Sequence, residues 1–125
     1  MNKNFLCLIK LVIGLTFLVG TSATALGEEF YKGKTIRIVV GFPPGGGYDA
    51  YTRAVARHMG KYIPGNPTLI VQNMDGSGSL VGAHYIYSGA KPDGLTVGVW
   101  DSGQVLKQVL GDTAIKFKAD KFGWI

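Results

Sequence analysis

The sequence predicts an α/β fold built around a parallel sheet. Short apolar runs rich in β-branched residues alternate with longer segments of helical periodicity, and a glycine-rich or polar turn follows each apolar run. This alternation is typical of right-handed crossovers, which place successive strands parallel in one sheet. We therefore expect three strands and three helices, in the order 35–40, 48–62, 68–72, 80–88, 95–100 and 104–110.

The first strand, Thr35 to Val40, is apolar enough to be buried on both faces. It is followed by a glycine-rich turn, Gly41-Phe42-Pro43-Pro44-Gly45-Gly46-Gly47-Tyr48-Asp49. Consecutive glycines leave the backbone accessible to a ligand, and the first N–H groups of a helix starting at Tyr48 or Asp49 favour an anion. The alternative interpretation is that Gly45 to Gly47 only make a tight connection between strand and helix.

The first helix is predicted from apolar residues at positions i, i+3, i+4, i+7 and i+11, which should form its buried face. These residues are Tyr51, Ala54, Val55, His58 and Tyr62. Basic residues four apart lie elsewhere on the same helix and form either a solvated face or a patch for a partner. They are Arg53, Arg57 and Lys61. The prolines of Ile63-Pro64-Gly65-Asn66-Pro67 should end the helix.

Polar turns also follow the second and third strands. After the buried strand Thr68 to Gln72 comes the segment Asn73 to Ser79, in which Ser77 or Ser79 is a candidate N-cap for the helix Leu80 to Ser88. Asp101-Ser102-Gly103 follows the third strand. Because the carboxyl ends of parallel strands meet at one edge of a sheet, these turns should form a ligand-binding edge together with the first turn. The segment 112–125 has no clear period.

Length, charge and cysteine usage limit the classes of protein. The chain of 125 residues is long enough for one modest domain, and Met1 to Ala25 has the features of a cleaved signal peptide, with Gly27 as an alternative cleavage site. The rival interpretation, a membrane anchor, needs roughly 20 apolar residues, but Lys10 interrupts the apolar stretch.

The charge of the mature chain is only mildly basic. Without Lys3 and Lys10 the net charge is 11 − 8 = +3, which does not indicate a nucleic-acid partner. Cys7 lies inside the signal peptide, so the mature chain has no disulfide and no cysteine-ligated zinc.

The motifs favour binding without catalysis. Gly45 to Ala50 fits the letters of a dinucleotide motif, but Gln72 and Asn73 stand where the ribose-binding acid is expected, and no phosphate P-loop is present. Neither His58 nor His84 has a histidine or carboxylate at the i+4 spacing of a helical metal site. Asp49 is a candidate base, but an Asp at the start of a helix is first of all a cap. We therefore predict no catalytic residue, no cofactor and no metal.

Several spaced motifs carry a family resemblance from about Phe30 to the end of the chain. They are Phe30 to Ile36, the first glycine turn with Tyr48-Asp49, Ile63 to Pro67, Gln72-Asn73-Met74 with Gly76-Ser77-Gly78-Ser79, and Pro92-Asp93-Gly94. In these features the chain resembles the N-terminal part of the substrate-binding receptors of tripartite tricarboxylate transporters, the Bug family of periplasmic binding proteins.

The resemblance implies a two-lobed periplasmic-binding-protein fold of the type II, Venus-flytrap kind. Residues 26–125 would be the N-terminal part of lobe 1, and the fold would be incomplete because the second lobe is absent. The implied function is the capture of a small organic anion, such as a di- or tricarboxylate, by a periplasmic monomer that delivers it to membrane permease subunits. The implied ligand-binding residues are Phe42, Gly45, Gly46, Gly47, Tyr48, Asp49, Gly76, Ser77, Gly78 and Ser79, with Asp101 and Ser102 added from their position at a strand end.

This sequence also departs from the pattern of the family. Tyr48 stands where many members have Ser or Thr, so an aromatic wall would replace a hydroxyl contact, and Asp75 stands where many have Pro, so an extra negative charge would weaken carboxylate binding. Members continue through a second lobe, so this chain is expected to be a fragment or a truncated gene product that exposes Phe117, Phe122 and Trp124.

Two other functions remain as alternatives. One is an exported carboxylate sensor that passes a signal to a membrane partner. The other is a dinucleotide-dependent enzyme. A neighbouring permease gene would favour transport, whereas a neighbouring kinase gene would favour sensing.

Overall fold

The computed structural model describes residues 30–125. The predicted signal peptide and its cleavage site lie outside the described residues. Within the described part of the chain, no helix is both long and apolar enough to cross a membrane.

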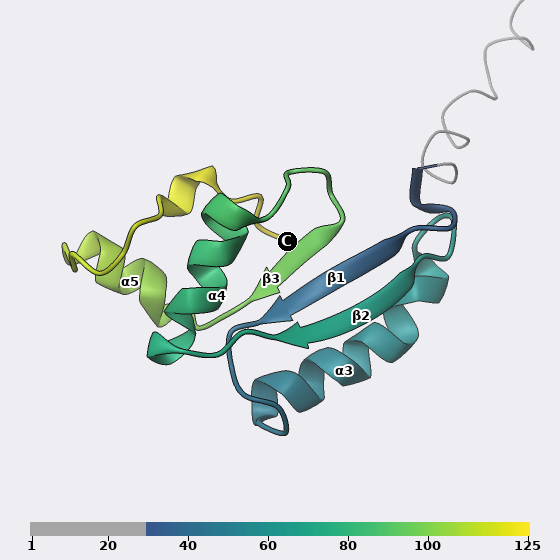
Figure 1. Cartoon of the computed structure of the whole chain (residues 1–125), viewed down its shortest axis with the longest axis horizontal. Helices are drawn as coiled ribbons and strands as arrows, with labels where there is room; N and C mark the ends of the chain where they lie inside the picture. Colours follow the sequence, from purple (N-terminus) through teal and green to yellow (C-terminus); the bar gives the residue numbers. More distant parts are fainter. Residues whose placement is uncertain (1–29) are drawn as a thin grey trace, which may run out of the picture.

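Three parallel strands form the centre of the fold (Figure 1). They are β1 (Thr35–Val40), β2 (Thr68–Asn73) and β3 (Thr96–Val99), in the spatial order β2-β1-β3. In this register Ile38 is paired with Val71 on one side and with Val97 on the other. The α/β class and the parallel sheet predicted from the sequence are therefore confirmed.

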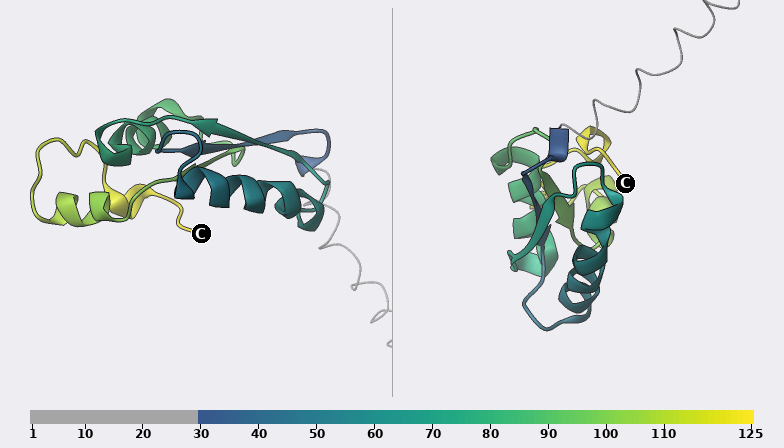
Figure 2. Two further views of the ribbon diagram at one scale, coloured as in Figure 1. Left: turned by 90° about the horizontal axis from the view of Figure 1, so that it is seen from below. Right: turned by 90° about the vertical axis from the view of Figure 1, so that its right-hand side faces the viewer.

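The helices cover both faces of the sheet. The three α-helices are α3 (Gly47–Met59), α4 (Leu80–His84) and α5 (Gly103–Val109). Figure 2 shows α3 on one face and α4 on the other, and Figure 1 shows α5 beyond the carboxyl ends of the strands. The chain leaves β1 through α3 to reach β2, and then returns past β1 through α4 to reach β3. Both crossovers are expected to be right-handed, and they run in opposite directions across the sheet. Their helices, α3 and α4, therefore lie on opposite faces.

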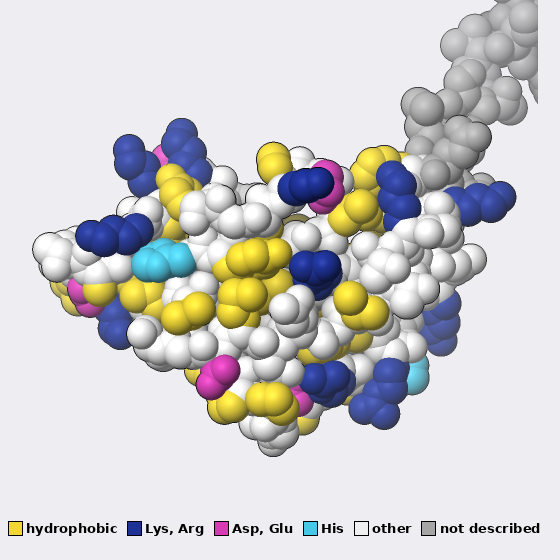
Figure 3. Space-filling model, viewed as in Figure 1, with side chains coloured by type: hydrophobic (Ala, Val, Ile, Leu, Met, Phe, Trp, Pro, Cys, Tyr) yellow, Lys and Arg dark blue, Asp and Glu magenta, His cyan; other side chains and the backbone are white. Residues whose placement is uncertain are grey.

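The predicted buried face of the first helix is wrong. The apolar residues of the stripe are exposed, with exposed fractions of 75% for Tyr51 and 76% for Tyr62, and His58 is exposed too. The helix instead turns Asp49 and Thr52 inward, each 4% exposed. The face that α3 turns toward the sheet is set at its first turn, where Asp49 is hydrogen-bonded to Gly45 and Asn73 at the strand ends. The spacing of hydrophobic residues contains no information about such a polar contact. Figure 3 shows the Lys and Arg side chains that gather over α3.

The edge strand β2 is less buried than its sequence predicted. In β1 the residues Ile38, Val39 and Val40 are at most 5% exposed, as expected for a central strand. In β2 exposed and half-buried residues alternate, so the prediction of a buried strand is wrong there. An apolar run has the same letters in a central and in an edge strand, and only the strand order separates the two.

The helix predicted at 80–88 changes its geometry part-way. Regular α-helix ends with α4 at His84, and a π-helical turn, Tyr85–Gly89, continues the segment. Helix α5 has bounds close to those predicted, and the segment after it contains a 3₁₀ turn, Ala119–Lys121.

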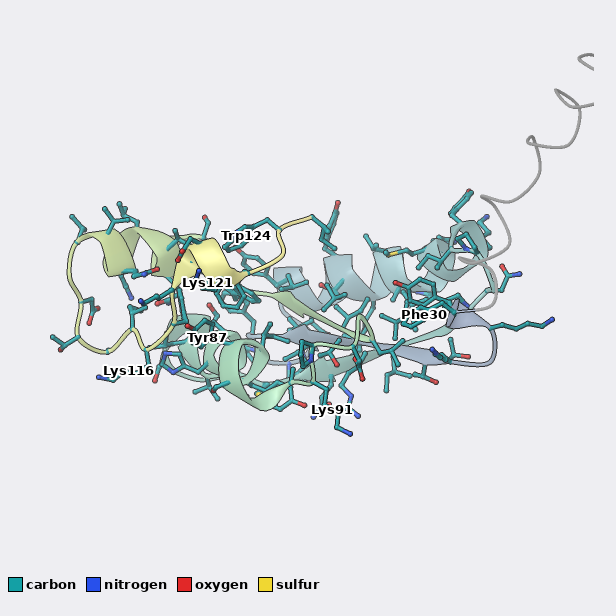
Figure 4. The ribbon with its side chains drawn as sticks, turned by 90° about the horizontal axis from the view of Figure 1, so that it is seen from above. Phe30, Tyr87, Lys91, Lys116, Lys121 and Trp124 are labelled. Carbon is teal, nitrogen blue, oxygen red and sulfur yellow. The ribbon has the colours of Figure 1, made fainter. Side chains whose placement is uncertain are left out.

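The C-terminal segment packs back onto α4. Phe117 is 3% exposed and forms a core cluster with Leu80 and Ala83, which corrects the expectation that Phe117 would be exposed. The backbone N–H of Lys116 donates to His84 Nε2 at 3.0 Å. Phe122 is half-buried, whereas Trp124 remains 58% exposed. Figure 4 shows Tyr87, Lys121 and Trp124 around this segment, well away from Phe30. A segment without hydrophobic period is thus held by individual aromatic contacts.

Candidate functional site

Three loops meet at the carboxyl edge of the sheet, as the sequence predicted. We name them loop 1 (Gly41–Gly46, after β1), loop 2 (Met74–Ser79, after β2) and loop 3 (Trp100–Ser102, after β3). The parallel ladder extends into them, because Met74 N–H donates to Val40 O at 2.7 Å and Gly41 N–H donates to Val99 O at 2.9 Å. The sheet therefore fixes where each loop begins.

Loops 1 and 2 touch through residues without bulky side chains. A Cβ atom placed on Gly41 would lie 2.6 Å from Ser79 Cβ and 3.0 Å from Ser79 O. A Cβ atom on Gly82 of α4 would lie 3.0 Å from Gly41 Cα. Van der Waals contact between carbon atoms needs about 3.5–4.0 Å. Glycine is therefore required at both positions for α4 and loop 2 to pack against the end of β1.

Loop 2 has an unusual backbone, because four successive residues have positive φ. The φ angles are 135° at Gly76, 49° at Ser77, 63° at Gly78 and 77° at Ser79. Left-handed backbone costs a residue with a Cβ atom about 1–2 kcal/mol, so Ser77 and Ser79 are strained. Ser79 does precede α4, but its side chain makes no capping hydrogen bond.

Side chains link loop 2 to loop 3 and α5. The hydroxyl oxygen of Ser79, a residue that is 1% exposed, accepts a hydrogen bond from Asp101 N–H at 3.0 Å. Gln104, also 1% exposed, donates from Nε2 to Gly78 O at 2.5 Å. No donor among the described residues reaches Gln104 Oε1, although buried acceptors are ordinarily hydrogen-bonded. Sequence reasoning missed Gln104, because a glutamine inside a short helix carries no motif.

Asp49 ties loop 1 to α3 and β2. Its carboxylate accepts hydrogen bonds from Gly45 N–H at 2.9 Å, from Asn73 Nδ2 at 2.9 Å and from Arg53 Nε at 2.9 and 3.0 Å. Asn73 Nδ2 also donates to Phe42 O at 2.9 Å, and Asn73 Oδ1 accepts from Arg53 Nη2 at 2.9 Å. We call Asp49, Arg53 and Asn73 the polar brace. It fixes both ends of loop 1 to the strand edge.

The charge of Asp49 is compensated inside the brace. The hydrogen bond from Arg53, followed by those from Gly45 and Asn73, lowers the pKa of Asp49 from 3.8 to about 2. The carboxylate is therefore ionised throughout the neutral range, and both of its oxygens are occupied. Arg53, predicted to lie on a solvated basic face, is half of an ion pair whose guanidinium side chain is 44% exposed.

An aromatic side chain of loop 1 stacks on one from the first turn of α3. The rings of Phe42 and Tyr48 lie 4.1 Å apart between centroids and 9° from parallel. Phe42 is half-buried, whereas Tyr48 is 43% exposed. All twelve residues predicted to bind ligand lie in the three loops or in the first turn of α3, at the same edge of the sheet.

The backbone donors at the end of loop 1 and in the first turn of α3 are only partly used. Gly45 N–H donates to Asp49, and Ala50 N–H closes the first turn of α3 by donating to Gly46 O at 2.9 Å. The N–H groups of Gly47, Tyr48 and Asp49 precede this bond and have no carbonyl one turn back within the helix. They form the positive end of the dipole of a 13-residue helix.

The described residues offer few groups for metal or acid–base chemistry. They contain no group of three or more His, Cys, Asp or Glu side chains that could hold a metal ion. His58 is exposed on α3, and His84 Nε2 accepts the hydrogen bond from Lys116 on the other side of the sheet. An open groove along the free edge of β3 is lined largely by apolar and aromatic side chains and reaches the site at Ser102.

Comparisons with known proteins give partial matches. The chain is 32% identical over 98 residues to the UPF0065 protein in the tcbD-tcbE intergenic region of a Pseudomonas species. It is 34% identical over 71 residues to Protein BugT of Bordetella pertussis. The chain is a partial homologue of the Bug family. The resemblance of this chain to the Bug receptors of tripartite tricarboxylate transporters, predicted from its motifs, is therefore confirmed as homology.

The extent of the Bug homology is limited. The two alignments cover 78% and 57% of this chain but only 28% and 21% of the relatives. The matched segment thus spans less than a third of the length of these Bug relatives. No protein-family model matches the chain, and no solved structure matches it.

Proposed function

We propose that this chain forms the N-terminal part of the first lobe of a periplasmic solute receptor, in which loops 1 and 2 bind a small organic carboxylate. The observation that carries the proposal is the convergence of three loops at the carboxyl edge of a parallel sheet, in a homologue of the Bug family. Open α/β sheets bind their ligands at this edge.

The electrostatics of loop 1 favour an anion. The N–H groups of Gly47 and Tyr48 lie at the positive end of α3, where a carboxylate is stabilised by both hydrogen bonds and the helix dipole. The one acidic side chain inside this turn, Asp49, is paired with Arg53 at 2.9 Å. The pairing keeps its negative charge from repelling a bound carboxylate.

The role we assign to Asp49 is positioning. Asp49 is only 4% exposed, and its two oxygens accept hydrogen bonds from Gly45, Asn73 and Arg53, so the carboxylate is poorly placed to reach a ligand as a general base would. The brace holds loop 1 in one conformation before the ligand arrives, which lowers the entropy cost of binding. The proposed activity is therefore binding without chemical change, and the proposed partner of the receptor is a membrane permease.

The test of the proposal is a substitution at Gly46. This residue has a φ of −76°, and a Cβ atom there would have Pro43 O as its nearest neighbour at 3.6 Å, so the backbone tolerates a side chain. Gly46→Val would add two methyl groups next to the N–H groups of the first turn of α3. The matched control is Gly123→Val, because a Cβ atom on Gly123 meets nothing within 4 Å and lies in the C-terminal segment.

The measurement is the midpoint of thermal unfolding of the full chain, with and without succinate. At a succinate concentration 100 times the dissociation constant, binding raises the free energy of unfolding by about 2.7 kcal/mol. We expect this increase for the natural sequence and for Gly123→Val, and its loss for Gly46→Val. An equal increase in a folded Gly46→Val variant would show that loop 1 is not the site.

A further inference from the structure

The aromatic rings of Phe42 and Tyr48 stack on each other at the start of α3. Phe42 precedes and Tyr48 follows the segment 43–47, and their rings are 9° from parallel at a centroid distance of 4.1 Å. The stacked rings therefore join loop 1 to the first turn of α3. The ring that is 43% exposed belongs to Tyr48, which also contributes a backbone N–H to the first turn of α3.

The surroundings of Tyr48 place this ring beside the proposed anion site. Phe42 is joined directly to Gly41, which packs against Ser79 of loop 2. Asp49, the next residue after Tyr48, is fixed by the polar brace. The aromatic pair is therefore anchored by its neighbours in sequence, through Gly41 to loop 2 and through Asp49 to the polar brace, and Tyr48 itself is 43% exposed at the start of α3.

The physical chemistry of this surface selects a kind of ligand. A carboxylate needs the backbone donors of the turn, whereas the outer face of a stacked aromatic pair offers a flat apolar surface without a hydrogen-bonding requirement. Aromatic rings at such a face gain about two- to tenfold in affinity from ring–ring contact beyond the burial of their area. A short aliphatic dicarboxylate has no ring to place there.

Resting on the proposed function, we propose that the site takes a planar aromatic carboxylate. The carboxylate group binds the backbone N–H groups of loop 1, and the aromatic ring of the ligand extends the stack of Phe42 and Tyr48. In this arrangement Tyr48 determines specificity, and its ring serves both to close loop 1 and to receive the ring of the ligand.

The experiment compares three carboxylates on the full chain. Benzoate and cyclohexanecarboxylate have the same charge and nearly the same size and differ in the π-face, and succinate reports on carboxylate binding alone. Binding is followed through the amide resonances of Gly46, Gly47 and Tyr48 in NMR titrations, with nuclear Overhauser effects between benzoate and the Tyr48 ring as a direct signature. The variant is Tyr48→Leu. The matched control is Tyr51→Leu, since Tyr51 is 75% exposed on the same helix one turn away.

We expect benzoate to bind about two- to tenfold more tightly than cyclohexanecarboxylate, to contact the Tyr48 ring, and to lose this advantage in Tyr48→Leu but not in Tyr51→Leu. Equal affinity of loop 1 for all three acids in the natural sequence would overturn the aromatic preference and leave the carboxylate site in place. This comparison needs no variant, so it holds even if Tyr48→Leu does not fold. If none of the three acids shifts the loop 1 amides, the proposed function itself is refuted, and the aromatic preference with it.

Discussion

Replacing Gly41 by alanine would put a methyl group into the contact between loop 1 and loop 2. The new Cβ atom would lie 2.6 Å from Ser79 Cβ, 3.0 Å from Ser79 O and 3.1 Å from Ser79 Cα. Since carbon atoms in contact are about 3.5–4.0 Å apart, the overlap is about 1 Å. Two of these three atoms are backbone, so no side-chain rotation relieves it. Overpacking of this kind costs about 1–3 kcal/mol.

The assay is thermal unfolding followed by circular dichroism. In a domain of this size each kcal/mol lowers the midpoint by about 4–8 °C, so Gly41→Ala should melt at least several degrees below the natural sequence. The matched control is Gly47→Ala, where the added Cβ atom meets nothing within 4 Å. At that position alanine should be neutral or stabilising, because it restricts the unfolded chain more than glycine does.

A second substitution tests whether the overlap with Ser79 is the cause. Ser79→Gly removes the nearest atom and suits the φ of 77°, although it also removes the acceptor of the Asp101 N–H. The double variant Gly41→Ala with Ser79→Gly should therefore lose less stability than the sum of the single variants, by about 0.5–3 kcal/mol. If Gly41→Ala melts at the same temperature as Gly47→Ala, or if the two effects simply add, the packing of loop 1 on loop 2 is not as described.

Two further predictions concern the charge of Asp49 and the strain of loop 2. Because the pKa of Asp49 in the folded state, about 2, lies below its ordinary value of 3.8, its contribution to stability is complete above about pH 4 and is lost as the pH falls toward 2. Acid titration of the unfolding midpoint should show this loss in the natural sequence and in Asp75→Asn, but a flatter profile between pH 4 and 2 in Asp49→Asn. Ser77→Gly should stabilise the chain by up to about 1 kcal/mol in chemical denaturation, because the φ of Ser77 is 49°. The control Ser102→Gly should not stabilise it, because the φ of Ser102 is −59°. Equal effects of the two changes would contradict backbone strain at Ser77.

The sequence by itself determined the elements and the edge of the sheet at which the polar loops meet. The apolar β-branched run of β1 and the helical periodicity between the strands define a parallel α/β order, because these patterns depend only on local spacing. Glycine-rich or polar turns after each strand then have to meet at one edge, whatever the details of packing. The placement of Gly45, Ser79 and Asp101 in neighbouring loops follows from this rule.

Only the tertiary structure decided which faces are buried and which polar groups are paired. The inward face of α3 is set by the hydrogen bonds from Gly45 and Asn73 to Asp49, two contacts that no hydrophobic periodicity contains. The burial of Phe117 depends on the return of the C-terminal segment to α4. Gln104 meets Gly78 across 26 residues of sequence. Such contacts join residues that are distant along the chain, so their energies appear only once the strands and loops have been brought together.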